Sequence, residues 1–361
     1  DVDFTYPRSF KEELLKNIPD YRIVEDTKYT EREEDKEAYR DAMFRMMDAR
    51  FRAALYIMER YPWDVFMVTF MGVDHAQHWF WRYMDPTHPK YVKDERFSNT
   101  IFEAYRKMDE VLGFFMENLP PEATLIIMSD HGGGPCYGSV NLNYYLMKTG
   151  FLKLKRKPIT VAKEFLYIFD VTPYSIGRFL IGKGMAKRVA KIRMQGRRKL
   201  ANLIGLTYQD IDWGKTMAYA FGCYGPVFIN TKSRSPLGCV DEKDFEKVRR
   251  EVLHALMKIE DPVKKKPLIT RWWKGEELYG KKEWAPDIVI AMGDFSYTTS
   301  VFAFPSFRLF TDPLTFKSGD HTLYGVFGIM GEGIPEGKKL KEVSIVDIAP
   351  TIYRILGVQP P

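Results

Sequence analysis

Three short segments combine aspartate with histidine, two residue types that bind divalent cations in hydrolytic enzymes. The chain has 361 residues and only 6 histidines, and four of these histidines lie in the three segments. The segments are residues 74–78, 129–134 and 318–321. Imidazole and carboxylate groups are ligands that zinc and manganese centres use. The sequence therefore predicts a metal centre, provided that the fold brings the segments together.

The first segment places Asp74 and His78 four residues apart. In a helix this spacing puts both side chains on one face, one turn apart, where they could share a cation. The pattern is weak evidence by itself. Asp74 could equally cap a helix, and His78 could be a core or surface histidine.

The other two segments adjoin apolar runs that are typical of buried strands. Asp130 and His131 follow the apolar run 123–128 and precede three glycines. Ligands of α/β proteins bind where strands end, and glycines let the backbone approach a bound group closely. A tight turn would explain the glycines but not the histidine. His321 precedes a further apolar run, although alone it is ambiguous.

Apolar periodicity predicts the elements that must position these segments. Apolar residues recur at three- and four-residue steps over about 30–60 and 99–118, which indicates two long helices, and a last helix is expected over 347–356. Short apolar runs predict strands at 64–70, 123–128, 226–230, 287–291 and 324–330. The alternation favours an α/β fold, a three-layer α/β/α sandwich with a mostly parallel central sheet.

Residues 151–212 differ from the rest and are expected to form a helical insertion, which could act as a lid. A basic run extends from Lys183 to Lys199. It could contact an anionic surface, such as a phosphate-rich partner or lipid headgroups. The alternative is a solvated helix face, which is the more common meaning of such a run.

The composition narrows the class of protein only a little. The net charge of +6 and the pI near 8.9 suit an anionic substrate but also an ordinary soluble protein. The three cysteines form no CxxC pair, so we expect a reducing compartment and a cytoplasmic location. No apolar run is long enough for a transmembrane segment. We expect no sequence-specific nucleic-acid binding.

Taken together, these segments resemble the alkaline phosphatase superfamily, and within it the type I phosphodiesterase/nucleotide pyrophosphatase branch. The resemblance is carried by residues 72–78, 126–132, 319–321 and 346–352. It implies two divalent metal ions, zinc or manganese. Asp74, His78 and His321 would bind one ion, and Asp130 with His131 would bind the other.

The resemblance also implies a Thr or Ser nucleophile and one more Asp ligand near the first strand of the fold. Residues 1–60 offer no matching segment, so no catalytic nucleophile is identifiable here. We therefore expect residues 1–361 to be a single alkaline phosphatase-like domain that lacks its N-terminal segment and is inactive without it.

The expected activity is hydrolysis of a phosphate ester or nucleotide-like small molecule by in-line displacement between the two ions. Two alternatives stay open: a phosphomutase on the same scaffold, and a non-catalytic binding protein that retains the fold. A sulfatase would need a Cys- or Ser-x-Pro-x-Arg motif, which the sequence lacks.

Overall fold

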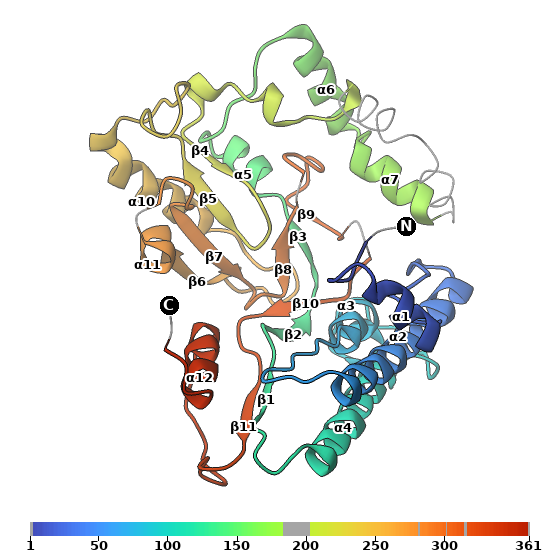
Figure 1. Ribbon diagram of the computed structural model, residues 1–361. Helices are drawn as coiled ribbons and strands as arrows, with labels where there is room; N and C mark the ends of the chain where they lie inside the picture. Colours follow the sequence, from blue (N-terminus) through green and yellow to red (C-terminus); the bar gives the residue numbers. More distant parts are fainter. Residues whose placement is uncertain (1–2, 183–202, 281, 301, 314–315, 360–361) are drawn as a thin grey trace.

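The structure is a computed structural model that describes residues 3–182, 203–280, 282–300, 302–313 and 316–359. Helices from the first third of the chain gather on one side of it (Figure 1). These helices are α1 (Phe10–Asn17), α2 (Glu33–Arg60), α3 (Gly72–Met84) and α4 (Thr100–Asn118). The two long helices expected from periodicity are thus confirmed as α2 and α4.

Helices α2, α3 and α4 share an aromatic core. Phe80 and Tyr83 of α3 are fully buried beside Met43 of α2 and Ile101 of α4. Three acidic residues occupy the first turn of α2, where they favour the positive end of the helix dipole. The helix ends at Arg60 because Pro62 would remove a backbone donor and clash within it. This core fixes the orientation of α3.

In the part of the chain that the structure describes, the strands form four small sheets instead of one. Strand β1 (Leu125–Met128) pairs antiparallel with β11 (Phe327–Met330), and β2 (Gly132–Pro135) pairs antiparallel with β10 (Gly319–Thr322). Strand β3 (Gly138–Val140) lies between β8 (Tyr297–Thr299) and β9 (Phe310–Thr311). The fourth sheet has the order β4 (Ala218–Ala220), β5 (Pro226–Ile229), β7 (Ile288–Met292) and β6 (Ile269–Lys274).

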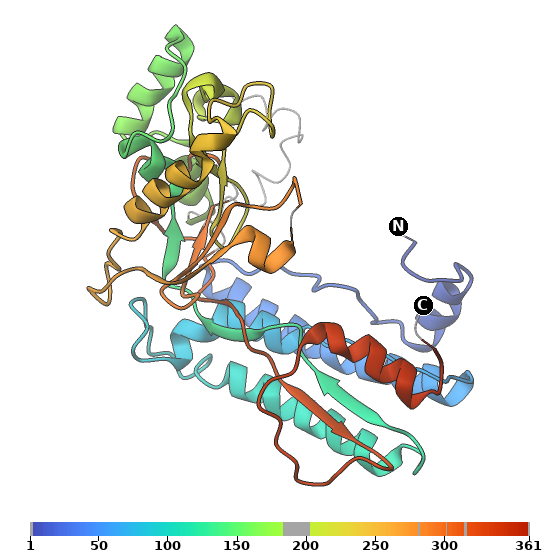
Figure 2. The same cartoon turned by 90° about the vertical axis from the view of Figure 1, so that its left-hand side faces the viewer.

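The fold is therefore mixed α/β, as expected, but the pairing is mostly antiparallel. Among the named strands of the described residues, only β3 and β8 pair in parallel. The three-layer sandwich remains a prediction. Helix α4 lies on one side of the β1–β11 pair and α12 (Ile348–Ile355) on the other (Figures 1 and 2). The last predicted helix is thereby confirmed as α12.

The largest hydrophobic core lies around the fourth sheet. Helices α5 (Leu142–Lys148) and α10 (Phe245–Leu256) bury Leu146 and Val252 against it, and α11 (Gly275–Tyr279) follows β6 directly. The predicted strands at 226–230, 287–291 and 324–330 correspond to β5, β7 and β11, with bounds shifted by a few residues.

The strand predicted at 64–70 is wrong. This segment pairs with no described strand. Phe66, Val68 and Phe70 pack against α2 and α4, whereas Met67 is 85% exposed. The residues alternate as in a strand, but a strand also needs a neighbour to bond its backbone groups. The segment is thus covered on one face only, not on both.

The predicted insertion contains helices α6 (Pro158–Ile168) and α7 (Pro173–Gly182), at the top of Figure 1. Its two ends enter the main core through Leu152, Leu206 and Ile211. The basic run Lys183–Lys199 lies outside the described residues, and the lid remains a prediction. No described helix combines the length and the apolar character needed to cross a membrane.

Candidate metal centre

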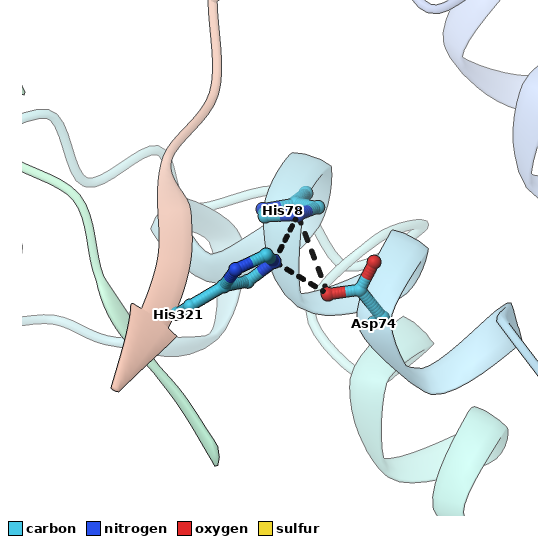
Figure 3. A group of neighbouring side chains, drawn as sticks. All are labelled: Asp74, His78 and His321. Atoms are coloured by element: carbon cyan, nitrogen blue, oxygen red, sulfur yellow. Dashed lines mark hydrogen bonds and ion pairs between the residues drawn. The ribbon is translucent and has the colours of Figure 1, made fainter. Parts of the chain in front are cut away.

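Three side chains from α3 and β10 meet at one point (Figure 3). Asp74 and His78 project from one face of α3, as their spacing predicts, and His321 comes from β10. Asp74 Oδ1 lies 3.3 Å from Nε2 of His78 and 3.3 Å from Nε2 of His321. The two Nε2 atoms are 3.1 Å apart. The three atoms form a nearly equilateral triangle.

Glycines allow the two elements to come this close. A Cβ atom on Gly319 would lie 2.2 Å from the backbone oxygen of Gln77, and one on Gly133 would lie 2.1 Å from the side-chain oxygen of the same residue. Helix α3 therefore packs directly on the backbones of β10 and β2. The register places His321 opposite Gly133. Of the three glycines after His131, Gly133 thus serves the packing of α3, whereas Gly132 and Gly134 make room for Tyr324 and Thr322.

The outer nitrogens of both imidazoles are engaged, which determines where their protons lie. His78 Nδ1–H donates to the backbone oxygen of Gly319 at 2.9 Å. The Tyr224 hydroxyl donates to Asp320 Oδ1 at 2.9 Å and therefore accepts from His321 Nδ1–H at 3.2 Å. In their neutral forms both histidines then present an unprotonated Nε2 to Asp74.

Local electrostatics favour these protonation states. Burial lowers the pKa of His78, assisted by the positive charge of Lys317, so the imidazole is neutral near pH 7. Burial and the neighbouring Asp320 raise the pKa of Tyr224, so its hydroxyl stays protonated and can donate.

This donor set fits a divalent cation. Three lone pairs that point at one another repel unless a proton or a cation lies between them. In a tetrahedral zinc site with bonds of about 2.05 Å, ligand atoms are separated by about 3.3 Å. The observed separations of 3.1–3.3 Å match that geometry. The set of two imidazoles and one carboxylate also leaves a position for another ligand.

The second predicted pair, Asp130 and His131, lies beside this triangle. The ring of His131 stacks on that of His321 at 3.6 Å between centroids. Asp130 Oδ1 is 3.6 Å from His131 Nε2, and the Asp130 side chain is 76% exposed. Within the described residues, no third ligand joins these two. All five predicted residues are thus neighbours, but only three of them converge.

Sequence reasoning missed Tyr224, which bonds both Asp320 and His321. The residue has a left-handed backbone (φ +62°) between Gly222 (φ +99°) and Gly225 (φ +78°), in the turn from β4 to β5. Two glycines around a tyrosine signal a tight turn, but not what the turn faces. His75 faces Glu25 instead of the triangle, in agreement with its omission from the predicted ligands.

Comparisons with known proteins place the chain in a family. A family model described as type I phosphodiesterase / nucleotide pyrophosphatase matches residues 2–301. The match ends before His321, so the place of β10 in the site rests on the geometry above. No curated protein and no solved structure matches the chain. Proteins of this family hydrolyse phosphoric diesters and generally depend on metal ions. Because the match covers most of the sequence, the chain belongs to the type I phosphodiesterase / nucleotide pyrophosphatase family, a branch of the alkaline phosphatase superfamily.

Proposed function

We propose that this chain provides most of a two-metal centre for hydrolysis of phosphate esters, with a diester or a nucleotide-like small molecule as substrate. The observation that carries the proposal is the convergence of Asp74, His78 and His321, three donor atoms 3.1–3.3 Å apart. Family membership supplies the reaction class, and the donor geometry supplies the requirement for a cation.

The chain's own residues would have distinct tasks. Asp74, His78 and His321 would hold one divalent cation, zinc or manganese. Asp130 and His131 would hold the second, with Asp130 reaching into solvent, where an anionic ester arrives. When bound, the two cations stabilise charge on the phosphoryl oxygens and favour deprotonation of the attacking hydroxyl. Tyr224 and Gly319 keep the two imidazoles in the required tautomer.

The second cation needs further ligands, and we propose that an additional segment brings them. It would carry an Asp and a Thr or Ser nucleophile, and would form a strand against residues 64–70. Support comes from residues 64–70, which pair with no described strand, from the exposed Met67, and from β1, which has β11 as its one neighbour among the described strands. Such a strand would also extend the small sheets toward the expected three-layer sandwich with a mostly parallel centre.

Metal content tests the centre directly. We expect the wild-type protein, purified without chelator, to hold zinc or manganese near stoichiometry by elemental analysis. His321→Ala should lose the metal because the triangle loses one corner. In the protein extended by the nucleophile segment, His131→Ala should lose the second ion. His254→Ala is the matched control, since His254 is an exposed histidine of α10. Unchanged metal in both site variants, or none in the wild type, would contradict the proposal.

Turnover tests the missing nucleophile separately. With metal supplied, we expect the 361-residue chain to leave bis(4-nitrophenyl) phosphate intact, and the protein extended by the nucleophile segment to hydrolyse it. Robust hydrolysis by residues 1–361 alone would show that the nucleophile lies within them. A matched assay with 4-nitrophenyl phosphate separates diester from monoester preference.

A further inference from the structure

Helix α6 turns its polar residues inward, the reverse of an ordinary surface helix. Thr160, Lys163 and Tyr167 are buried. The Lys163 ammonium pairs with Asp210 at 3.1 Å, and Thr160 donates to the same carboxylate. The Tyr167 hydroxyl donates to the backbone oxygen of Phe304. These bonds hold the helix in one rotational position about its axis.

The opposite face of α6 presents large apolar side chains to solvent. Phe165 is 60% exposed, Ile168 69% and Phe169 64%, and Val161 and Ile159 are also exposed. Positions 158, 161, 162, 165 and 169 follow the helical repeat, so they form one stripe. The rings of Phe165 and Phe169 are in edge contact, with centroids 4.9 Å apart. A continuous apolar stripe of this kind marks an interaction surface.

The exposed charges in the stretch of chain that contains this stripe are all positive. Over residues 153–171 the exposed charged side chains are Lys153, Arg156 and Lys157, which precede α6. The acidic residues of this stretch are more buried, and Asp170 is paired with Arg308. An aromatic and aliphatic stripe beside cations, without exposed carboxylates, is complementary to an anionic, apolar surface.

We propose that the α6 face docks on an anionic lipid bilayer, with Phe165 and Ile168 entering the interface and the three cations contacting headgroups. A helix at the edge of the molecule can lie flat on such a surface (Figure 1). A second copy fits less well, because the same stretch of another chain offers no exposed carboxylate to the cations. The surface consists of described residues alone and does not depend on the metal centre.

Vesicle sedimentation tests this proposal on the full chain. We expect the wild type to sediment with vesicles of phosphatidylcholine and phosphatidylglycerol, and far less with phosphatidylcholine alone. The F165S/I168S variant should lose about tenfold in binding because it removes the two apolar anchors. Arg156→Glu with Lys157→Glu should abolish the preference for anionic vesicles. The matched control is L237S/L340S, which replaces two comparably exposed leucines elsewhere.

Three results would overturn the proposal. The first is equal sedimentation of the wild type and F165S/I168S, which would assign any binding to another surface. The second is no binding of the wild type to anionic vesicles. The third is a concentration-dependent dimer in light scattering that F165S/I168S abolishes, which would make a second copy the occupant. Circular dichroism and thermal melts of each variant check that the overall fold is retained.

Discussion

Replacing Tyr224 with Phe removes one oxygen atom and tests how the site holds His321. The hydroxyl bridges Asp320 and His321 Nδ1 at 2.9 and 3.2 Å. Asp320 keeps its bond from the His321 backbone N–H at 2.9 Å, so β10 should retain its position. The His321 ring, by contrast, loses the acceptor that keeps the proton on Nδ1 and the lone pair on Nε2.

The expected loss in metal affinity follows from that bond. One neutral hydrogen bond is worth about 1 kcal/mol net, and loss of an outer partner of a metal-binding histidine costs about 10–100-fold in affinity. We expect the Kd for zinc to rise about tenfold, which corresponds to a loss of about 1.4 kcal/mol of binding free energy. The site is partly open around His321, which favours the lower end of that range.

The assay is zinc titration in competition with a chromophoric chelator. Tyr219→Phe is the control. Tyr219 lies on β4, the strand that precedes the turn with Tyr224, and outside the metal site. An affinity within twofold of wild type for Tyr224→Phe would refute the tautomer argument. If the wild type itself binds no zinc, the metal centre fails instead, and the two failures are distinguishable.

Two further substitutions test the packing around the site and the insertion. Gly319→Ala should weaken metal binding and lower the melting temperature, because its Cβ would meet the Gln77 backbone at 2.2 Å, and Gly113→Ala, with open space around it, should do neither. Lys163→Ala should destabilise the protein by about 3 kcal/mol, because it leaves the buried Asp210 carboxylate without its cationic partner. Burial alone would raise the pKa of Asp210, but hydrogen bonds from the Thr207 backbone and from Lys163 lower this pKa. The ionised carboxylate therefore stabilises the fold at pH values above 3.8, the ordinary pKa of Asp, and this stabilisation is lost as the pH falls through the lowered pKa. Thermal melts from pH 7 to pH 3 should therefore show a smaller acid destabilisation in Lys163→Ala than in wild type, and parallel curves would contradict this assignment.

The helices were predictable because their signal is local and long. Helix α2 begins at Glu33 instead of about residue 30, and α4 at Thr100 instead of 99. Strand partners were not predictable in this way. Strand β1 pairs with β11, about two hundred residues away, and nothing in either apolar run specifies the other. In residues 64–70, buried and exposed side chains alternate as in a strand, but no described strand pairs with this segment.

The site divides in the same manner. Asp74 and His78 are four residues apart in one helix, so their position on a common face could be predicted from the sequence. The position of His321 beside them could not be predicted, because it depends on the β2–β10 pairing and on glycines that let α3 pack closely against these two strands. Tyr224 lies 97 residues before His321 in a turn of another sheet. Its role follows only from tertiary contacts, which no single-sequence pattern encodes.

The two halves of the centre differ in how completely this chain specifies them. The first set has its three donors, their tautomers and the packing that holds them, all within α3, β10 and the turn at Tyr224. The second has Asp130 and His131 just after β1, with the Asp130 side chain exposed and no third ligand among the described residues. A ligand set that is built without further partners can bind its cation first. The more exposed set then gains affinity only when another segment covers it, so metal binding at the two sites should be separable, with the Asp74 site the tighter in these 361 residues.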